Sequence, residues 1–281
     1  MAGSISFLCS VVIIPSGMAK KITAIVVNYF TVHLLPPILA SLEEEPSVAE
    51  IIVADNSRQS ALQDCIKPFG KAKLLTFPEN IGFGAAVNRA AVMAGGDFRL
   101  VLNPDIRLLP GAITALTDAA TSTGATLTGP RYYWDDQLTF RFSPATGHSL
   151  WLRTGMEMAE RYRPDSALVD FTTDAMFQRH WQAQEPFAEP FLNGACLLIR
   201  NDPALFPAAK IFDEQFFMYF EDTDLSLRML LRGDYPVCAP GATAIHYWNQ
   251  SPSGQKSQMM ADSEKVRSEE RRVGKECRSR W

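Results

Sequence analysis

Apolar and polar positions in the first half of the chain fall into short blocks that predict alternating strands and helices. Uniformly apolar, β-branched runs are typical of strands buried on both faces, and apolar positions gathered on one side are typical of helices. We expect strands at Lys21–Tyr29, Glu50–Ser57, Lys73–Phe77 and Phe98–Leu102, and helices at Val32–Glu44, Gly84–Gly95 and Pro110–Thr121. This order predicts an α/β fold in which helices cover both faces of a mostly parallel sheet.

The pattern is lost between Gly129 and about Pro190, where aromatic residues and arginines are mixed without a clean period. This stretch is either a ligand-binding insert or an irregular connection, and its pattern does not decide between them. Regular blocks then return. They predict a strand at Pro190–Arg200, a helix that begins near Glu221, and two final strands in DYPVCAP and ATAIHYW.

The charge of the chain gives no sign of a nucleic-acid partner. The 281 residues include 27 Lys and Arg and 31 Asp and Glu, which gives a formal charge of −4.

The end of the polar tail 253–281 is left out of the fold prediction, because Arg267–Trp281 is dense in charge and has no amphipathic period. That segment resembles the translation of a sequencing-adapter oligonucleotide, so we expect an artefactual end and a missing natural C-terminus. Without its net charge of +3, the rest of the chain carries −7.

The first 20 residues also differ from the rest. Ser4–Pro15 is apolar, but no Lys or Arg precedes it and it is too short to span a bilayer. Met18 would open the first strand naturally, so we expect residues 1–20 to be a spurious extension; a signal peptide is the alternative. The cysteines form no CxxC pair, which favours reduced thiols in a cytosolic protein.

Polar residues stand where the predicted parallel strands end, the edge at which such sheets bind ligands. Asn28, Asp55 and Asp105 occupy these ends. Asp105 follows Asn103 and Pro104, and a carboxylate on so rigid a turn suits a hard cation such as Mg²⁺ or Mn²⁺. An Asx-turn or a helix N-cap is the alternative interpretation of Asp105.

Two further motifs are ambiguous by themselves. In ENIGFGAAVNRA, Gly82 and Gly84 stand at a loop-to-helix junction where backbone N–H groups could meet an anion, although turn glycines are common. His246 closes an apolar strand and is either a ligand or a core histidine.

The stretch FFMYFEDTD places Glu221, Asp222 and Asp224 directly behind four aromatic residues. Acidic residues in the first turn of a helix favour its dipole, which explains one or two carboxylates without a ligand. The aromatic residues before them would instead desolvate a carboxylate and raise its pKa towards that of a general base.

Six motifs follow one another along the chain: IVVNYF, IIVADNS, NIGFGAAVNRA, LNPDI, FLNGACLLIR and FFMYFEDTDLSLR. Taken in this order, they resemble family 2 glycosyltransferases of the GT-A fold, most closely the bacterial rhamnosyltransferase-like branch. Each motif is weak alone, but their order is specific. The resemblance covers residues 21–252, with 131–188 as a variable insert, and implies a Rossmann-like central sheet with an acceptor-side subregion.

The resemblance also implies roles for the matching residues. Asp222 of the Glu221–Asp222 pair would be the catalytic base, and Asp105 and His246 would hold a divalent cation, Mg²⁺ or Mn²⁺. Asn103 departs from the Asp-x-Asp motif of the family, which leaves Asp105 as the metal ligand. Donor-binding residues would be Val27, Asn28, Asp55, Gly82, Asn88 and Asn103, and acceptor-binding residues Asn193, Gly194 and Tyr219.

The activity implied is inverting transfer of a sugar, rhamnose in this branch, from a nucleotide-sugar donor to a glycan or lipid-linked glycan hydroxyl during synthesis of cell-surface polysaccharide. The implied location is cytoplasmic, with a peripheral contact at the inner face of the plasma membrane through the missing C-terminus. A sugar nucleotidyltransferase is one rival, although that class has a Gly-rich loop and a Lys or Arg after its first strand, where Asn28-Tyr29-Phe30 stands here. An inactive, truncated sugar-binding protein is the other.

Overall fold

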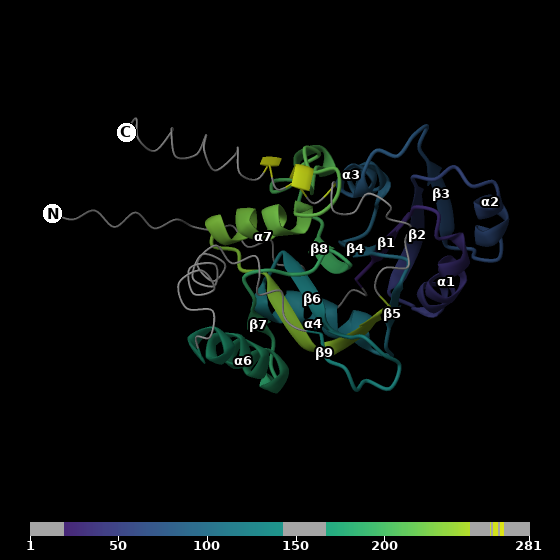
Figure 1. The fold of residues 1–281 in the computed structure, drawn as a ribbon. Coiled ribbons are helices and arrows are strands. Elements are labelled where there is room, and N and C mark those ends of the chain that lie inside the picture. The colour runs from purple at the N-terminus through teal and green to yellow at the C-terminus, as the bar shows by residue number, and fades with distance from the viewer. Residues whose placement is uncertain (1–19, 143–166, 248–258, 260, 264, 267–281) are drawn as a thin grey trace, which may run out of the picture.

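The computed structural model describes residues 20–142, 167–247, 259, 261–263, 265 and 266. The proposed spurious extension, apart from its last residue, and the adapter-like end lie outside this part. The described residues form a nine-stranded sheet with helices on both of its faces (Figure 1). The predicted α/β class with a mostly parallel sheet is therefore confirmed.

The strands follow the order β3-β2-β1-β4-β8-β6-β9-β5, and β7 pairs with β9. Parallel pairing joins β1 to β2 and β4, β2 to β3, and β6 to β9, whereas β8, β5 and β7 run antiparallel to their neighbours. The bounds are β1 Ile22–Asn28, β2 Val48–Asp55, β3 Ala72–Thr76, β4 Phe98–Leu102, β5 Ile106–Leu108, β6 Leu127–Tyr133, β7 Phe187–Ala188, β8 Cys196–Arg200 and β9 Val237–His246.

The helices that were predicted begin near the residues expected, whereas those at 61–66 and 167–182 were not predicted. Pro36 and Pro37 lie in the first turn of α1, where the missing N–H groups break no helical hydrogen bond. The bounds are η1 Val32–Leu34, α1 Leu35–Glu44, α2 Ala61–Ile66, α3 Phe83–Met93, α4 Ala112–Thr123, α6 Ala167–Gln182, η3 Pro207–Ala209 and α7 Glu221–Leu231. No helix in this part of the chain is long and apolar enough to cross a bilayer.

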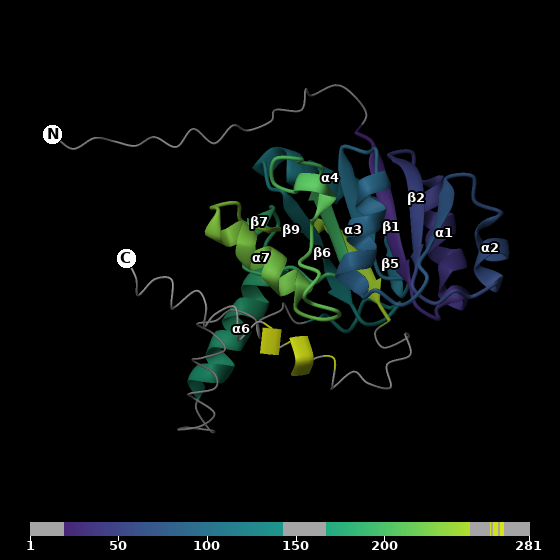
Figure 2. The same ribbon diagram turned by 90° about the horizontal axis from the view of Figure 1, so that it is seen from above.

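The central strands are buried on both faces, since every position of β1 and of β4 is buried. In β1, Ile22, Ala24 and Val26 pack on one side with α1, α2 and α4. Ile25 and Val27 pack on the other side with α3 and α7. Figure 2 shows these layers from above. Cys196 and Cys238 are buried free thiols, as expected.

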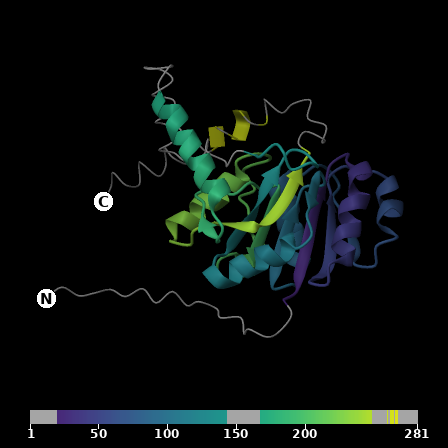
Figure 3. The same cartoon turned by 90° about the horizontal axis from the view of Figure 1, so that it is seen from below.

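Two predictions for the second half were wrong in detail. The strand expected at Pro190–Arg200 begins only at Cys196, because the residues before it form a loop. The two strands expected near the end of the chain form a single strand, β9. Its pairing with β6 changes register between Cys238 and Thr243, and this change accommodates Pro240. The irregular stretch contains α6, which projects from the body of the fold (Figures 2 and 3); its sequence mixes polar and apolar residues without a period.

Candidate active site

Strands β1, β2, β4, β6 and β9 run in one direction, so their last residues meet at one edge of the sheet. At this edge Asn28 and Asp55 are paired in register and fully buried. The Asn28 amide donates to Oδ1 of Asp55 at 3.0 Å, and Asp55 also accepts from the backbone N–H groups of Ser57 and Arg58. These hydrogen bonds make the predicted donor-binding end of the sheet rigid.

Asn56, which the sequence motif analysis did not single out, joins this edge to the glycine loop. Its side chain accepts from the N–H of Ile81 at 3.2 Å and donates to the carbonyl of Gly82 at 3.1 Å. The sequence signal that could have identified Asn56 is its place as a polar residue directly after a buried strand. Gly82 has φ +87°, and a Cβ there would lie 2.4 Å from the carbonyl oxygen of Phe217. Only glycine permits this contact.

Asn88, a predicted donor-binding residue, holds the chain that leads to the acidic cluster. Its Oδ1 accepts from the N–H groups of Ile211 and Phe212, and its Nδ2 donates to the Phe212 carbonyl and to Glu214. These four hydrogen bonds, to three residues, fill the capacity of the amide. The structure thus assigns Asn88 a structural role, and its donor contact stays a prediction, as does that of Val27, which packs in the core.

Asp105 and His246 meet at the same edge, in the β5–β9 region. Both side chains are buried, with Asp105 Oδ1 3.5 Å from His246 Nε2. Asp105 Oδ1 accepts no hydrogen bond from the described residues. A buried carboxylate oxygen beside an imidazole fits a divalent cation, whose other ligands would be phosphate oxygens and water. In this part of the chain no three His, Cys, Asp or Glu residues cluster as a complete protein-only metal site.

The acidic cluster begins α7 after a strained turn. Tyr219 and Phe220 have φ of +70° and +68°, a left-handed conformation that is uncommon for aromatic residues and costs energy. This turn buries Glu221, whose Oε2 accepts no hydrogen bond from the described residues. Asp224 points elsewhere, since its Oδ2 pairs with Nε of Arg228 at 2.7 Å. The helix-dipole explanation therefore suits Asp224 better than its two predecessors.

Asp222 is held by the loop before β8. Its Oδ2 accepts from the N–H of Gly194 at 2.9 Å, and its Oδ1 accepts from the N–H of Thr223 at 2.7 Å. A Cβ on Gly194 would lie 3.1 Å from the Asp222 Cβ, so this approach favours glycine. Burial raises the pKa of Asp222, against these hydrogen bonds. Burial and then the Asp222 charge raise the pKa of Glu221 to about 8.

Tyr132 on β6 connects the loop before β8 to the side chain of His246. Its hydroxyl donates to the carbonyl of Cys196 at 3.1 Å and lies 3.4 Å from that of Asn193, while its ring lies 6.1 Å from the His246 ring. On the other side, the N–H of Asn103 donates to the carbonyl of Ala195 at 2.8 Å. The loop that holds Asp222 is thus fixed to the strand end that leads to Asp105.

The raised pKa of Glu221 predicts a pH-dependent cost in stability. The folded state keeps this proton up to about pH 8, whereas the unfolded chain releases it near pH 4.5. Stability therefore falls as the pH rises between these values. Glu221→Gln should raise the free energy of unfolding near pH 8 by several kcal/mol, and urea unfolding should show the gain vanish near pH 4.5. Glu44→Gln, at an exposed position of α1, is the control; an equal effect there would contradict the assignment.

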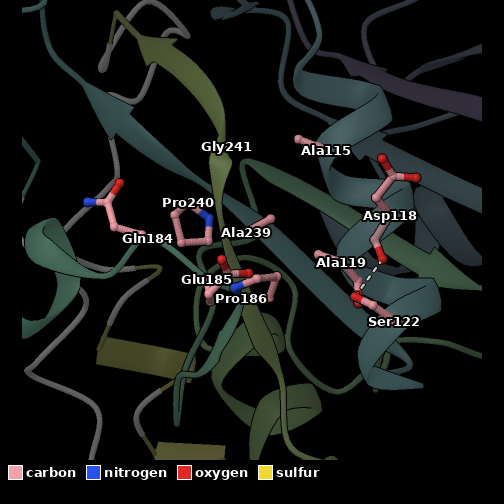
Figure 4. A pocket seen from close by; sticks show the side chains of 10 residues that line it. All are labelled: Ala115, Asp118, Ala119, Ser122, Gln184, Glu185, Pro186, Ala239, Pro240 and Gly241. Carbon is pink, nitrogen blue, oxygen red and sulfur yellow. Dashed lines mark hydrogen bonds between the residues drawn. The ribbon is translucent and has the colours of Figure 1, made fainter.

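A pocket of about 310 Å³ lies elsewhere, between α4, the middle of β9 and the loop 184–186 (Figure 4). None of the site residues predicted from the sequence lines it. Its walls are mostly small residues, with Asp118 and Glu185 as the acidic groups. We therefore place the candidate active site at the carboxyl edge of the sheet and not in this pocket.

Comparison with known proteins identifies the family of the chain. Residues 23–183 match the family model described as glycosyl transferase family 2. The chain belongs to that family. It is also 30% identical, over 246 residues, to the N-acetylglucosaminyl-diphospho-decaprenol L-rhamnosyltransferase of Mycobacterium tuberculosis strain H37Rv, an alignment that covers 82% of this chain and 77% of the relative. The same figures hold for the protein of that name in strain CDC 1551.

Solved structures confirm the GT-A fold of this glycosyltransferase. One is GalNAc-T7 with UDP, GalNAc and Mn²⁺, with a TM-score of 0.54 and 13% identity over 81% of this chain. Another is the mannosyltransferase PcManGT from Pyrobaculum calidifontis with GDP-Man and Mn²⁺, with a TM-score of 0.53 and 14% identity over 82% of this chain. The chain spans 44% and 58% of these two proteins. At such identities the likeness supports the fold alone.

Proposed function

We propose that this glycosyltransferase inverts the anomeric centre as it transfers a sugar, rhamnose, from a nucleotide-diphosphate donor to a hydroxyl of a lipid-linked glycan. The sugar and acceptor are suggested by the rhamnosyltransferase relative. We place the reaction in cell-surface polysaccharide synthesis, at the cytoplasmic face of the membrane. The observation that carries the proposal is the Asp222 carboxylate, held by Gly194 at the edge where Asp105 and His246 meet.

The chemistry is a single in-line displacement. The acceptor hydroxyl oxygen attacks the anomeric carbon while the bond from that carbon to the donor diphosphate breaks, and the diphosphate leaves with the electron pair. Asp222 takes the hydroxyl proton. Its hydrogen bonds from Gly194 and Thr223 orient the carboxylate and leave lone pairs for this proton. Glu221, with its raised pKa, stays neutral at pH 7 and so adds no second charge to the turn.

Asp105 and His246 would hold a divalent cation, which supplies charge stabilisation to a departing diphosphate when bound. Support comes from the buried Oδ1 of Asp105, which lies beside His246 and accepts no hydrogen bond from the described residues. Asn28 and Asp55 form the rigid floor on which we place the nucleotide. Asn193, Gly194 and Tyr219 lie next to the acid pair, where the acceptor would enter.

The test is a panel of nucleotide-sugars, titrated calorimetrically with and without Mn²⁺ and then assayed for slow donor hydrolysis and for transfer to an acceptor with a short lipid tail. Metal-dependent binding with hydrolysis and transfer would support the proposal. Metal-independent glycan binding without hydrolysis would indicate an inactive sugar-binding protein instead.

Asp105→Ala should weaken Mn²⁺-dependent donor binding by at least ~10-fold, because a metal ligand matters no less than the groups that support one. Calorimetric titration measures this without turnover. Asp118→Ala, which removes an exposed carboxylate of α4, should leave the affinity unchanged. Equal Mn²⁺ dependence in wild type and Asp105→Ala would remove Asp105 from the metal site.

A further inference from the structure

The hairpin that follows β6 presents an apolar tip at the catalytic edge. The N–H of Trp134 donates to the carbonyl of Phe140 at 2.9 Å, and Tyr133 bridges to Arg141. Asp135 closes the turn by accepting from the N–H groups of Thr139 and Phe140. Three large apolar side chains remain exposed on this short hairpin: Trp134 at 42%, Leu138 at 38% and Phe140 at 67%. We call these three residues the hairpin tip.

The hairpin tip is continuous with the candidate active site. The Trp134 ring stacks on Phe142 with 4.4 Å between centroids, and Phe142 stacks on His246 at 6.1 Å. Tyr247 adds a second link, since its N–H donates to the carbonyl of Asp105 and its hydroxyl donates to Asp136. Because β6 runs parallel to β9, the hairpin rises from the edge at which His246 stands.

The charges beside the hairpin tip balance, since Asp135 and Asp136 are matched in number by Arg107 and Arg141. Asp136 pairs with Arg107 at 3.1 Å and accepts from Tyr247. Arg141 lies over the Trp181 ring at 5.0 Å. The residues beside the hairpin tip therefore present polar groups and the Tyr247 hydroxyl around an apolar centre. Side chains of this kind, with Trp and Tyr at the boundary, suit the interface between lipid headgroups and acyl chains.

We propose that the hairpin tip docks on the surface of the lipid bilayer that carries the acceptor. This inference rests on the proposed function. The relative named above acts on a sugar joined to decaprenol through a diphosphate, and a sugar so joined cannot move far from the bilayer surface. An enzyme of that specificity must bring its catalytic edge to the membrane, and the hairpin tip stands on that edge. Since the flanking charges balance, docking needs no anionic lipid.

The experiment compares wild type with Leu138→Asn/Phe140→Ser. These changes remove apolar surface and keep the backbone hydrogen bonds, and asparagine tolerates the φ of +56° at position 138. Val92→Ser/Met93→Ser is the matched control, with exposures of 66% and 50% at the far end of α3. Flotation with phosphatidylcholine vesicles measures docking. KM is measured for an acceptor with a long prenyl tail in vesicles and for a short-tailed acceptor in solution.

We expect wild type and the control to float with vesicles, with the hairpin variant losing most of this binding. Its KM for the vesicle-borne acceptor should rise on the order of tenfold, as expected when a marginal apolar anchor is lost, with KM for the soluble acceptor unchanged. Equal flotation and equal KM in all three proteins would overturn the proposal. It would also be overturned if wild type and the control formed a dimer and the hairpin variant did not. If wild type uses neither acceptor, the proposed function fails instead.

Discussion

Replacing Asp222 with asparagine should lower the rate of glycosyl transfer by roughly 10²–10⁴-fold, the usual contribution of a general base. The amide keeps the shape of the carboxylate and can still accept the Gly194 N–H at its oxygen. It cannot take the proton of an acceptor hydroxyl. Donor affinity should change no more than a few-fold, because we place the donor nucleotide at Asn28 and Asp55 and not at Asp222. Steady-state transfer assays and calorimetric donor binding measure the two quantities.

Asp224→Asn is the control for this variant. Asp224 stands on the same turn of α7, but its carboxylate pairs with Arg228 and not with Gly194. Its loss should cost about 0.3–0.5 kcal/mol of stability, as for other i,i+4 pairs, and leave kcat near that of wild type. Normal turnover in Asp222→Asn would refute the base assignment, whatever its donor affinity.

The first half of the fold could be predicted closely from the sequence because local patterns determine it. β1 and β4 are mostly apolar and buried at every position, and Pro36-Pro37 fits only the first turn of a helix. The acidic start of α7 was also visible, because its carboxylates follow four aromatic residues directly. These features depend on residues that are neighbours in the sequence, and the sequence alone therefore reveals them.

The rest depends on contacts between distant residues. Asn88 lies in α3, yet its amide is used by Phe212, 124 positions further along. Nothing near Asn88 in the sequence indicates this contact, and its predicted donor contact came from the family resemblance alone. The support that Tyr132 gives to the Asn193 loop was equally hidden, since the aromatic stretch around it has no period. The strand predicted from Pro190 began late for a similar reason: the loop at Gly194 is shaped by Asp222.

Replacing Gly82 with alanine should lower kcat by about 10²-fold, a loss typical of a displacement near 1 Å in a catalytic group. The new Cβ would lie 2.4 Å from the Phe217 carbonyl oxygen, which also accepts the Phe83 N–H at 3.0 Å. The Phe217 backbone must move, and it leads through the strained Tyr219–Phe220 turn directly to the acid pair. We expect the pH–rate profile to shift as well, because the raised pKa values of Glu221 and Asp222 depend on how they are buried.

Gly233→Ala separates this effect from backbone strain. Gly233 has φ +79°, close to the +87° of Gly82, but a Cβ there meets nothing within 4 Å. It should therefore lose about 1 kcal/mol of stability and keep both kcat and the pH–rate profile. Gly82→Ala has to be assayed at a temperature where urea unfolding shows it to be fully folded, since its extended ψ of 169° adds to the strain. If the two variants then turn over equally fast with the same profile, the contact between Gly82 and Phe217 does not position the base.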